Sequence, residues 1–286
     1  MSCVHKYKQY ETAWCPGCGN FPILDALQET LESLAIPQHQ VVIVGGIGQA
    51  AKTPQYINAN SFESLHGRAL PPATAIKMAN QNLKVIVNTG DGDSYGEGGN
   101  HFIHNIRRNI DITHFVHDNQ IYGLTKGQSS PTSDLGHVTD FTPKGVINQP
   151  LNPLVTAISL GAGFVARCFT GEKEHLVEIM KHAIEYKGYA LVDILQPCVS
   201  FNKINTFGWY KKRVYRLDKE TAKYDPTNKM SALEKAYEWG DKIPLGILYY
   251  EEKKSYLDHF EFLKDHALIE TSHQKEMIKT FMKEFQ

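Results

Sequence analysis

Two short segments near the middle of the chain carry side chains that suit a hard metal ion. Residues 90–93 (GDGD) and residues 118–123 (DNQIYG) each follow directly on an apolar run. Asp91 and Asn119 lie 28 positions apart, and a carboxylate, an amide oxygen and the backbone carbonyl of Ile121 would supply three oxygen ligands. Magnesium prefers oxygen ligands and completes its shell with phosphate and water. The two segments together predict a magnesium site next to a bound diphosphate.

The glycines of the first segment favour close approach of a phosphate group. Gly90 and Gly92 have no side chain, so the backbone on either side of Asp91 can contact a diphosphate. Backbone amides at the start of the helix expected near residues 95–99 would favour the same anion. An ordinary glycine-rich turn between a strand and a helix accounts for GDGD alone equally well. The second polar segment, after the following strand, is what favours a cofactor site.

Strands and helices alternate along the chain and would bring these segments to one edge of a sheet. This alternation is typical of an α/β fold with a mostly parallel sheet and helices on both faces. Ligands bind at the carboxyl ends of such strands, so Asp91 and Asn119 are expected to meet there. Apolar runs predict strands at residues 41–44, 84–87, 112–117, 164–169 and 190–195, and amphipathic stretches predict helices at residues 20–34, 72–82, 98–108, 153–160 and 172–187.

The cysteines form a second group of candidate ligands. Cys15 and Cys18 flank a proline and a glycine in WCPGCG, so a tight loop would direct both thiols to one point. Such a CxxC pair binds zinc or an iron–sulfur cluster, or carries out thiol–disulfide exchange, and the pattern alone leaves all three open. Cys198 follows the last predicted strand. Cys168 lies within a predicted strand and is expected to pack in the core.

Composition and charge limit the class of protein. The chain has 286 residues, of which 42% are hydrophobic and 21% charged, with a formal net charge of −1. We expect one large α/β domain over residues 1–205 and a C-terminal arm over residues 206–286. The near-neutral charge argues against a nucleic-acid partner. No apolar run approaches the roughly 18 residues that span a bilayer, and no signal core is present, which favours the cytoplasm without membrane contact.

The spacing of the two polar segments resembles the fingerprint of thiamin diphosphate enzymes. The extension YGLTKGQSSPTS, residues 122–133, makes the chain similar to the β subunit of 2-oxoacid:ferredoxin oxidoreductases, over roughly residues 12 to 250. The resemblance implies a thiamin diphosphate-binding fold with thiamin diphosphate and Mg²⁺ as cofactors. It also implies oxidative decarboxylation of a 2-oxo acid to acyl-CoA and CO₂, with coenzyme A as acyl acceptor and ferredoxin as electron acceptor.

The resemblance assigns roles to residues in several loops. Lys52 and Lys126 would meet the anionic substrate or coenzyme A, with two solvated lysines as the alternative. Asp91, Asn119 and Ile121 would hold the magnesium. The implied cofactor-binding residues are Ile47, Gly48, Gln49, Ala50, His66, Gly90, Asp91, Gly92, Asp93, Asn119, Ile121, Gly123, Leu124 and Thr125.

The same resemblance makes Cys15, Cys18 and Cys198 ligands of a [4Fe-4S] cluster. Members of the family carry a further cysteine ligand where this chain has Gln49. An amide is a poor substitute for a thiolate on iron. Three outcomes stay open: a cluster with three cysteines and one unusual or open site, an unstable cluster that is lost, or a fourth ligand from another residue. We favour a bound but atypical cluster.

The family needs a partner to complete its active site. A glutamate of the α subunit (or of a fused αγ subunit) activates the cofactor, and no motif for it is found in this chain. We therefore expect the chain to be inactive alone and the site to lie at an interface between subunits. Two other classes remain, a cluster-less 2-oxo acid decarboxylase subunit and a non-catalytic binding subunit. Cys15, Cys18 and Cys198 argue against the first, and intact Asp91 and Asn119 argue against the second.

Overall fold

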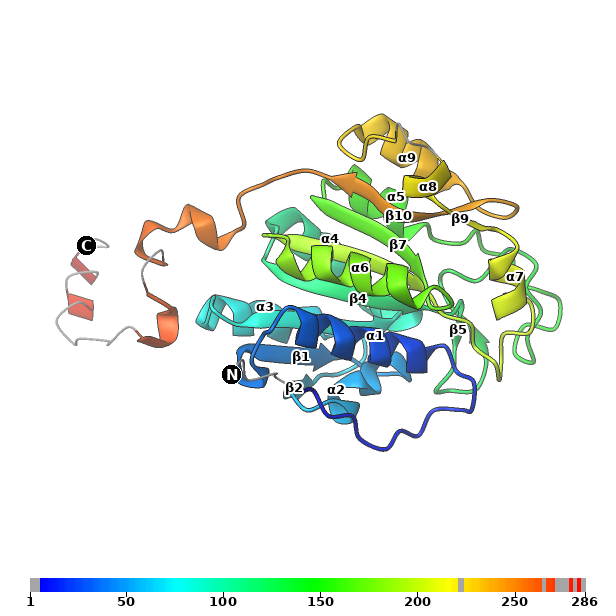
Figure 1. Ribbon diagram of the computed structural model, residues 1–286, viewed down its shortest axis with the longest axis horizontal. Coiled ribbons are helices and arrows are strands. Elements are labelled where there is room, and N and C mark those ends of the chain that lie inside the picture. Colours follow the sequence, from blue (N-terminus) through cyan, green and yellow to red (C-terminus); the bar gives the residue numbers. More distant parts are fainter. Residues whose placement is uncertain (1–5, 221–223, 264–265, 271–277, 280–281, 284–286) are drawn as a thin grey trace.

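One large sheet dominates the computed structural model, which describes residues 6–220, 224–263, 266–270, 278–279 and 282–283. Eight strands in these ranges pair in the order β2-β1-β3-β4-β8-β7-β10-β9 (Figure 1). The first six run parallel, and β10 runs antiparallel to β7. The predicted mostly parallel α/β fold is confirmed. The strands are β1 (Val41–Gly45), β2 (Asn60–Glu63), β3 (Lys84–Gly90), β4 (Ile112–Asp118), β7 (Phe164–Phe169), β8 (Tyr189–Leu195), β9 (Val214–Arg216) and β10 (Ile243–Tyr250), with a separate pair β5 (Ile121–Tyr122) and β6 (Gln128–Ser129).

Helices cover both faces of the sheet. Side chains alternate along each strand, so Ile43 and Ile86 pack on one face and Val44 and Val87 on the other. Helices α1 and α6 lie side by side over the first face (Figure 1), and α3, α4, α5 and α9 contribute to the core on the second. Burial on both faces explains why the strands are continuous apolar runs.

The bounds of the five predicted helices, α1, α3, α4, α5 and α6, match the sequence-based predictions to within three residues. The helices are α1 (Asn20–Ser33), α2 (Thr53–Tyr56), α3 (Leu70–Ala79), α4 (Gly99–Arg108), α5 (Pro153–Ser159), α6 (Lys173–Glu185), α7 (Phe207–Lys211), α8 (Leu217–Glu220) and α9 (Lys229–Tyr237), with short 3₁₀ turns η1 (Gln38–Gln40), η2 (Ala50–Lys52), η4 (Leu257–His259), η5 (Glu261–Leu263) and η6 (Leu268–Glu270). None of these helices is long and apolar enough to cross a membrane.

One local difference lies next to the predicted metal ligand. The chain becomes helical directly after Asp91, in a π-helix η3 (Gly92–Glu97) that precedes α4. The sequence pattern predicts a helix that starts several residues later. A π-helix has a wider turn than an α-helix, and such segments are frequent at functional sites.

The predicted C-terminal arm contributes strands to the main sheet. β10 pairs with β7, and β9 pairs with β10, so the chain up to residue 250 extends the sheet. Beyond β10 the chain leaves the sheet and runs away from it (Figure 1). The apolar residues of β10 are buried in the core, which explains this difference from a simple arm. The domain boundary at residue 205 stays a prediction.

Candidate functional site

Asp91 lies where β3 and β4 end side by side. The two strands pair in parallel with Gly90 opposite His117, so the residues that follow each strand reach the same edge of the sheet. Thr132 joins them, because its hydroxyl lies 2.7 Å from Asp91 Oδ2 and 2.9 Å from Asp118 Oδ1. The structure thus brings the two predicted segments together and adds a residue from the loop after β6.

Burial controls the charge of these carboxyl groups. Asp91 has only 1% of its surface exposed, and burial raises its pKa, while hydrogen bonds from Ser130 and Thr132 lower it. Burial, together with the charges of Asp193 and Asp91, raises the pKa of Asp118 well above its usual range. Thr132 has one hydroxyl proton to offer two carboxyls, so one of them carries a proton of its own, and we assign that proton to Asp118. Asp91 is then the carboxylate that a nearby cation would stabilise.

Asn119 follows β4 with both ends of its side-chain amide engaged. Its Oδ1 accepts a hydrogen bond from the backbone amide of Ile121 (3.0 Å), and its Nδ2 donates to Gln196 Oε1 (3.1 Å). Asn202 Nδ2 donates to the Asn119 backbone carbonyl (3.1 Å). A carbonyl oxygen has two lone pairs, so Oδ1 keeps one available for a metal ion.

Asp93 holds two loops against the end of β3 through hydrogen bonds. Its Oδ1 accepts hydrogen bonds from the backbone amides of Ile47 (3.1 Å) and Gly67 (2.6 Å) and lies 2.8 Å from His66 Nδ1. The hydrogen bond to Asp93 raises the pKa of His66. A Cβ at Gly46 would lie 2.0 Å from Asp93 Oδ2, so only glycine admits the carboxylate there. Asp93 therefore positions the loop after β1 that carries Ile47 and the loop that carries His66 and Gly67.

The two glycines beside Asp91 have different surroundings. A Cβ at Gly90 would meet no atom within 4 Å, so the backbone there borders open space. A Cβ at Gly92 would lie 2.2 Å from the Tyr122 ring, and the Tyr122 hydroxyl donates to Glu97 (3.1 Å). Gly90 is thus free for a ligand to approach, whereas Gly92 is required by packing at the start of η3.

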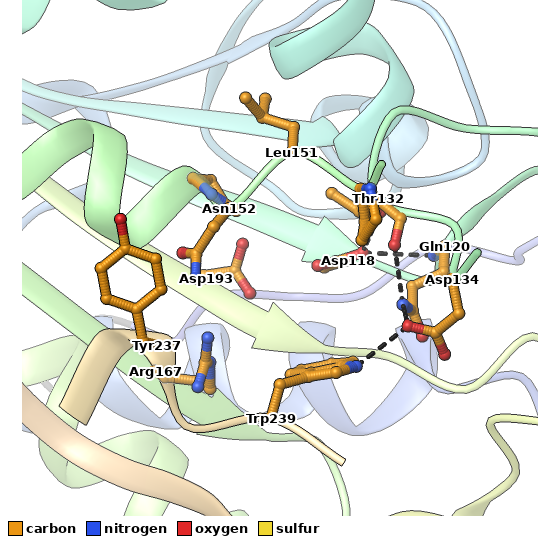
Figure 2. A pocket seen from close by; sticks show the side chains of 12 residues that line it. Asp118, Gln120, Thr132, Asp134, Leu151, Asn152, Arg167, Asp193, Tyr237 and Trp239 are labelled. Atoms are coloured by element: carbon orange, nitrogen blue, oxygen red, sulfur yellow. Dashed lines mark hydrogen bonds between the residues drawn. The ribbon is translucent and has the colours of Figure 1, made fainter. Parts of the chain in front are cut away.

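A cavity of about 230 Å³, lined by both polar and apolar side chains, includes Asp118 and Thr132 in its wall (Figure 2). The Arg167 guanidinium lines it, is buried, and lies 5.5 Å from the centre of the Trp239 ring. Its Nε and Nη1 have no hydrogen-bond partner in the described part of the chain. Burial raises the pKa of Asp193 to about 6. A cavity with these polar groups has the volume and partners to hold water.

The loops that carry Cys15 and Cys198 lie against each other. The backbone amide of Gly19 donates to the Pro197 carbonyl (3.4 Å), which joins the WCPGCG loop to the segment after β8. Ser200 Oγ donates to Cys15 Sγ (3.1 Å). Cys15 is exposed, and Cys198 is half-buried. The predicted convergence of these two distant segments is therefore seen.

Cys18 is half-buried, as Cys198 is. Gln196 Nε2 donates to its Sγ (3.7 Å). Burial raises the pKa of the Cys18 thiol to about 11, with smaller contributions from Cys198 and Cys15. Among the residues that the structure describes, no group of three or more His, Cys, Asp or Glu side chains is arranged to hold a metal ion. Cys168 is fully buried in the core, which confirms its predicted packing role.

Gln49 lies between the cysteine loop and the loop after β5. Its backbone carbonyl accepts a hydrogen bond from Trp14 Nε1 (2.8 Å), and Trp14 directly precedes Cys15. Its Cγ lies 3.8 Å from the position that a Cβ would take at Gly123. The Gln49 Oε1 atom is buried and has no partner in the described ranges. Ala50, next in the chain, is buried in η2.

The remaining predicted residues lie in more open positions. Lys52 ends η2 and is half-buried, while Lys126 is exposed in the turn that joins β5 to β6, with φ of 75°. Leu124 is 42% exposed, and the exposed Thr125 donates to Gln128 Oε1 (2.5 Å). Both lysines therefore lie outside the buried network around Asp91.

A buried histidine connects the two halves of the site. His117 Nδ1 lies 2.8 Å from Asn20 Oδ1, just after Cys18, and Nε2 lies 3.2 Å from Asn88 Oδ1, just before Gly90. Burial lowers the pKa of His117 to about 3, so the ring is neutral and carries one N–H. One asparagine must therefore turn its Nδ2 toward the ring.

Sequence reasoning does not reveal the actual roles of three residues of this site. Asp118 and Gln196 stand out in the sequence only as neighbours of Asn119 and Cys198, and Thr132 only as one hydroxyl among several. Asp118 and Gln196 could have been found from their positions in the sequence, because each lies near a predicted ligand at the carboxyl end of a strand. For Thr132 the signal is only its residue type, a hydroxyl that could donate to a carboxylate or phosphate, because the sequence does not specify the path of its loop.

Two family models cover most of the chain. The model for the C-terminal TPP binding domain of thiamine pyrophosphate enzymes matches residues 36–194. The model for the C-terminal part of the pyruvate ferredoxin oxidoreductase beta subunit matches residues 198–265. The first covers the strands that present Asp91 and Asn119. The second begins at Cys198 and includes β9 and β10.

Named relatives and a solved structure agree with these models. The chain is 49% identical to the 2-oxoacid:ferredoxin oxidoreductase subunit beta of Saccharolobus solfataricus, over 84% of this chain and 82% of that one. It is 44% identical to the 2-oxoglutarate oxidoreductase subunit KorB of Mycobacterium tuberculosis, over 67% and 52% respectively. A solved 2-oxoglutarate:ferredoxin oxidoreductase from Magnetococcus marinus, with 2-oxoglutarate, coenzyme A and succinyl-CoA bound, has a TM-score of 0.89 and 34% identity, covering 96% of this chain and 94% of that one.

Proposed function

Because the chain belongs to the β subunits of the 2-oxoacid:ferredoxin oxidoreductases, we propose that it binds thiamin diphosphate, Mg²⁺ and a [4Fe-4S] cluster for oxidative decarboxylation of a 2-oxo acid. The products are acyl-CoA and CO₂, and the electrons pass to ferredoxin. When bound, thiamin diphosphate supplies the electron sink for the loss of CO₂. The main support for this proposal is the buried Asp91 carboxylate, which lies where the carboxyl ends of β3 and β4 meet.

The metal assignment rests on the state of Asp91 and Asn119. A buried carboxylate is costly unless a positive charge or hydrogen bonds compensate it, and Thr132 supplies one hydrogen bond. A magnesium ion held by Asp91, Asn119 Oδ1 and the Ile121 carbonyl would supply the charge. The open backbone at Gly90 and Gly48 leaves room for the cofactor. His66 and residues 47–50, 90–93 and 123–125 are the proposed cofactor-binding surface.

Cys15, Cys18 and Cys198 are the proposed cluster ligands. Two of their sulfurs accept hydrogen bonds, from Ser200 and Gln196, and such bonds tune iron–sulfur clusters. Gln49 stands in the sequence where the family carries a fourth cysteine, and its orphaned Oε1 leaves it able to accept a new partner. Thiolate ligands need a reducing compartment, so we expect the enzyme in the cytoplasm.

Exposed apolar side chains around the site support a partner subunit. Ile47 is 38% exposed, Leu65 76% and Leu124 42%, and each belongs to a loop at the proposed cofactor surface. Exposed apolar side chains that gather near a site are typical of a protein interface. We propose that the α subunit, or a fused αγ subunit, covers it and completes the active site. Lys52 and Lys126 then attract the anionic 2-oxo acid or coenzyme A.

Metal and cluster analysis of the anaerobically purified αβ complex tests the proposal. We expect about four irons and four acid-labile sulfides per β chain, and an EPR signal of a reduced cluster after dithionite. Thiamin diphosphate should bind only with Mg²⁺ present. The isolated β chain should show no substrate-dependent ferredoxin reduction. Full activity of the isolated chain would contradict the need for the partner.

Gln49 also favours a second candidate, a cluster-less thiamin diphosphate-dependent decarboxylase subunit. Its Cγ lies 3.8 Å from the position that a Cβ would take at Gly123, on the proposed thiamin diphosphate surface, and it brings no thiolate to the cysteine loop. Absence of iron from protein never exposed to oxygen, with CO₂ release retained in the complex, would select this alternative.

A further inference from the structure

Gln196 contacts both halves of the proposed site with one buried side chain. It follows β8 directly and has 1% of its surface exposed. Its Oε1 accepts a hydrogen bond from Asn119 Nδ2 (3.1 Å), and its Nε2 donates to Cys18 Sγ (3.7 Å). Nε2 also donates to the Pro197 carbonyl (2.8 Å). Both N–H groups and the carbonyl of the amide are thus used.

The fold fixes Gln196 in this place from two sides. Its backbone amide donates to the Asp118 carbonyl (2.8 Å), which continues the parallel β4–β8 pairing one step past Leu195. This bond holds Gln196 beside Asn119. On the other side, a Cβ at Gly19 would lie 2.9 Å from Gln196 Cγ and 3.0 Å from Nε2. The glycine after Cys18 therefore makes the space through which the amide reaches the sulfur.

The orientation of each amide follows from a single carbonyl. The Pro197 carbonyl can only accept, so Gln196 must direct Nε2 toward it and toward Cys18. Gln196 Oε1 then faces Asn119 and can only accept, so Asn119 must direct Nδ2 toward it. Asn119 Oδ1 is thereby turned away from Gln196, toward the Ile121 amide. That oxygen is the one proposed to bind magnesium.

We propose that Gln196 is a positioning residue that links the metal ligand Asn119 to the cluster ligand Cys18. This role rests on the proposed function. At Asn119 it presents the oxygen, and not the nitrogen, of the side-chain amide to the metal ion. At Cys18 it donates an N–H to sulfur, which stabilises the additional negative charge of a reduced cluster and raises its reduction potential.

Ser200 offers a matched comparison within the same site. It also donates to a cluster sulfur, Cys15 Sγ at 3.1 Å, and this bond does not involve Asn119. Ser200→Ala removes a hydrogen bond to sulfur alone. Gln196→Met removes the bond to sulfur and the bond to Asn119 while keeping an unbranched side chain of similar length. Gln196→Asn keeps both polar groups but is one methylene too short to reach both partners, and it is the milder variant.

The test uses anaerobic αβ complexes and begins with iron analysis of the wild type. The cluster reduction potential is measured by EPR-monitored titration, and the Mg²⁺ dissociation constant from thiamin diphosphate binding without substrate. Gln196→Met is expected to shift the potential to more negative values and to weaken Mg²⁺ binding about tenfold. Ser200→Ala is expected to shift the potential only. Gln196→Asn should show the changes of Gln196→Met at smaller size.

Three results would overturn the proposal. If Gln196→Met has full iron content and an unchanged reduction potential, the proposed role of Gln196 at Cys18 is refuted. If its Mg²⁺ affinity is unchanged, the proposed role at Asn119 is refuted. Weakened Mg²⁺ binding in Ser200→Ala would show that any disturbance of the cluster loop reaches the metal, so Gln196 would have no special role. Absence of iron from the wild-type complex is a different failure, because it overturns the proposed function itself and with it the role at Cys18.

Discussion

The Asp91 region and the cysteine region are both predicted cofactor sites, yet they are built differently. Asp91 lies at the end of a central strand, is 1% exposed, and is held by Thr132 within a network of buried polar groups. Cys15 and Cys198 lie on loops, and Cys15 is exposed. The first site is anchored by strand pairing, whereas the second is held by the contact of two loops.

The two regions owe their geometry to different supports. Parallel pairing of β3 and β4 fixes the backbone next to Asp91 and Asn119 before any cofactor binds. The cysteine loops have fewer supports, chiefly Ser200, Gln196 and the Trp14 bond to Gln49. We therefore expect the Asp91 region to keep its geometry without a cofactor and the cysteine region to depend on iron for its order.

The largest effect is expected from Asp91→Asn. This change preserves shape and the hydrogen bond from Thr132 but removes the charge, so Mg²⁺ affinity of the αβ complex should fall at least about 100-fold. Burial raises the pKa of Asp91, which means that its charged form is costly in the folded chain. Without cofactor, the complex of the Asp91→Asn variant should therefore be at least as thermally stable as the wild-type complex. Isothermal titration and thermal unfolding measure the two effects. Asp140→Asn, at an exposed position, is the control, and equal loss of Mg²⁺ binding there would refute the assignment.

The next effect separates the two regions. Cys198→Ser should remove most of the iron from the anaerobic complex, because a serine hydroxyl is a poor ligand for iron in a cluster. Thiamin diphosphate affinity should stay within about twofold, because Asp91 is supported by strands and not by the cluster. Cys168→Ser, buried in the core, is the matched control and should retain its iron. Retention of iron by Cys198→Ser would refute its assignment as a ligand.

Two buried histidines of β4, His114 and His117, contribute stability that should be lost in acid. Burial lowers the pKa of His114 and of His117 to about 3, from 6.5. Between these values each of the two histidines binds a proton in the unfolded chain but not in the folded chain, so their contribution to stability rises with pH and is lost as pH falls below 6.5. Each histidine contributes a slope of about 1.4 kcal/mol per pH unit. Urea unfolding between pH 6.5 and 5 measures the slope of stability against pH. His117→Gln should reduce this slope by about 1.4 kcal/mol per pH unit, the contribution of one proton. An unchanged slope would show that His117 titrates normally.

The smallest effect is expected from a change at Gln49, which should alter the cysteine region and leave the Asp91 region unchanged. Gln49→Cys restores a thiol where the family has its fourth ligand, so the cluster should survive longer in air or with an iron chelator. Mg²⁺ affinity should not change, because Asp91 and Asn119 are untouched. Iron release followed by absorbance measures the first quantity. If the variant loses iron as fast as the wild type, another residue already serves as the fourth ligand.

Local patterns in the amino-acid sequence predict the main strands and helices, and the positions of the proposed ligands along them. Apolar periodicity is a local property, so β4 and β7 could be predicted to within one residue of their ends. The carboxyl ends of parallel strands meet at one edge, which was enough to bring residues 90–93 near residues 118–123. Cys15 and Cys198 were grouped only through the resemblance to a family.

The hydrogen bonds that support these residues could not be predicted from the sequence and are seen in the folded chain. Thr132 reaches back from a loop to bond Asp91, and Gln196 joins Asn119 to Cys18 because β8 pairs with β4 in a particular register. The apolar segment that became β10 could equally have covered a partner, and its pairing with β7 placed it in the sheet. Such contacts join residues far apart in the chain. They depend on strand register and loop path, which are set by the packing of the whole domain and not by any local pattern.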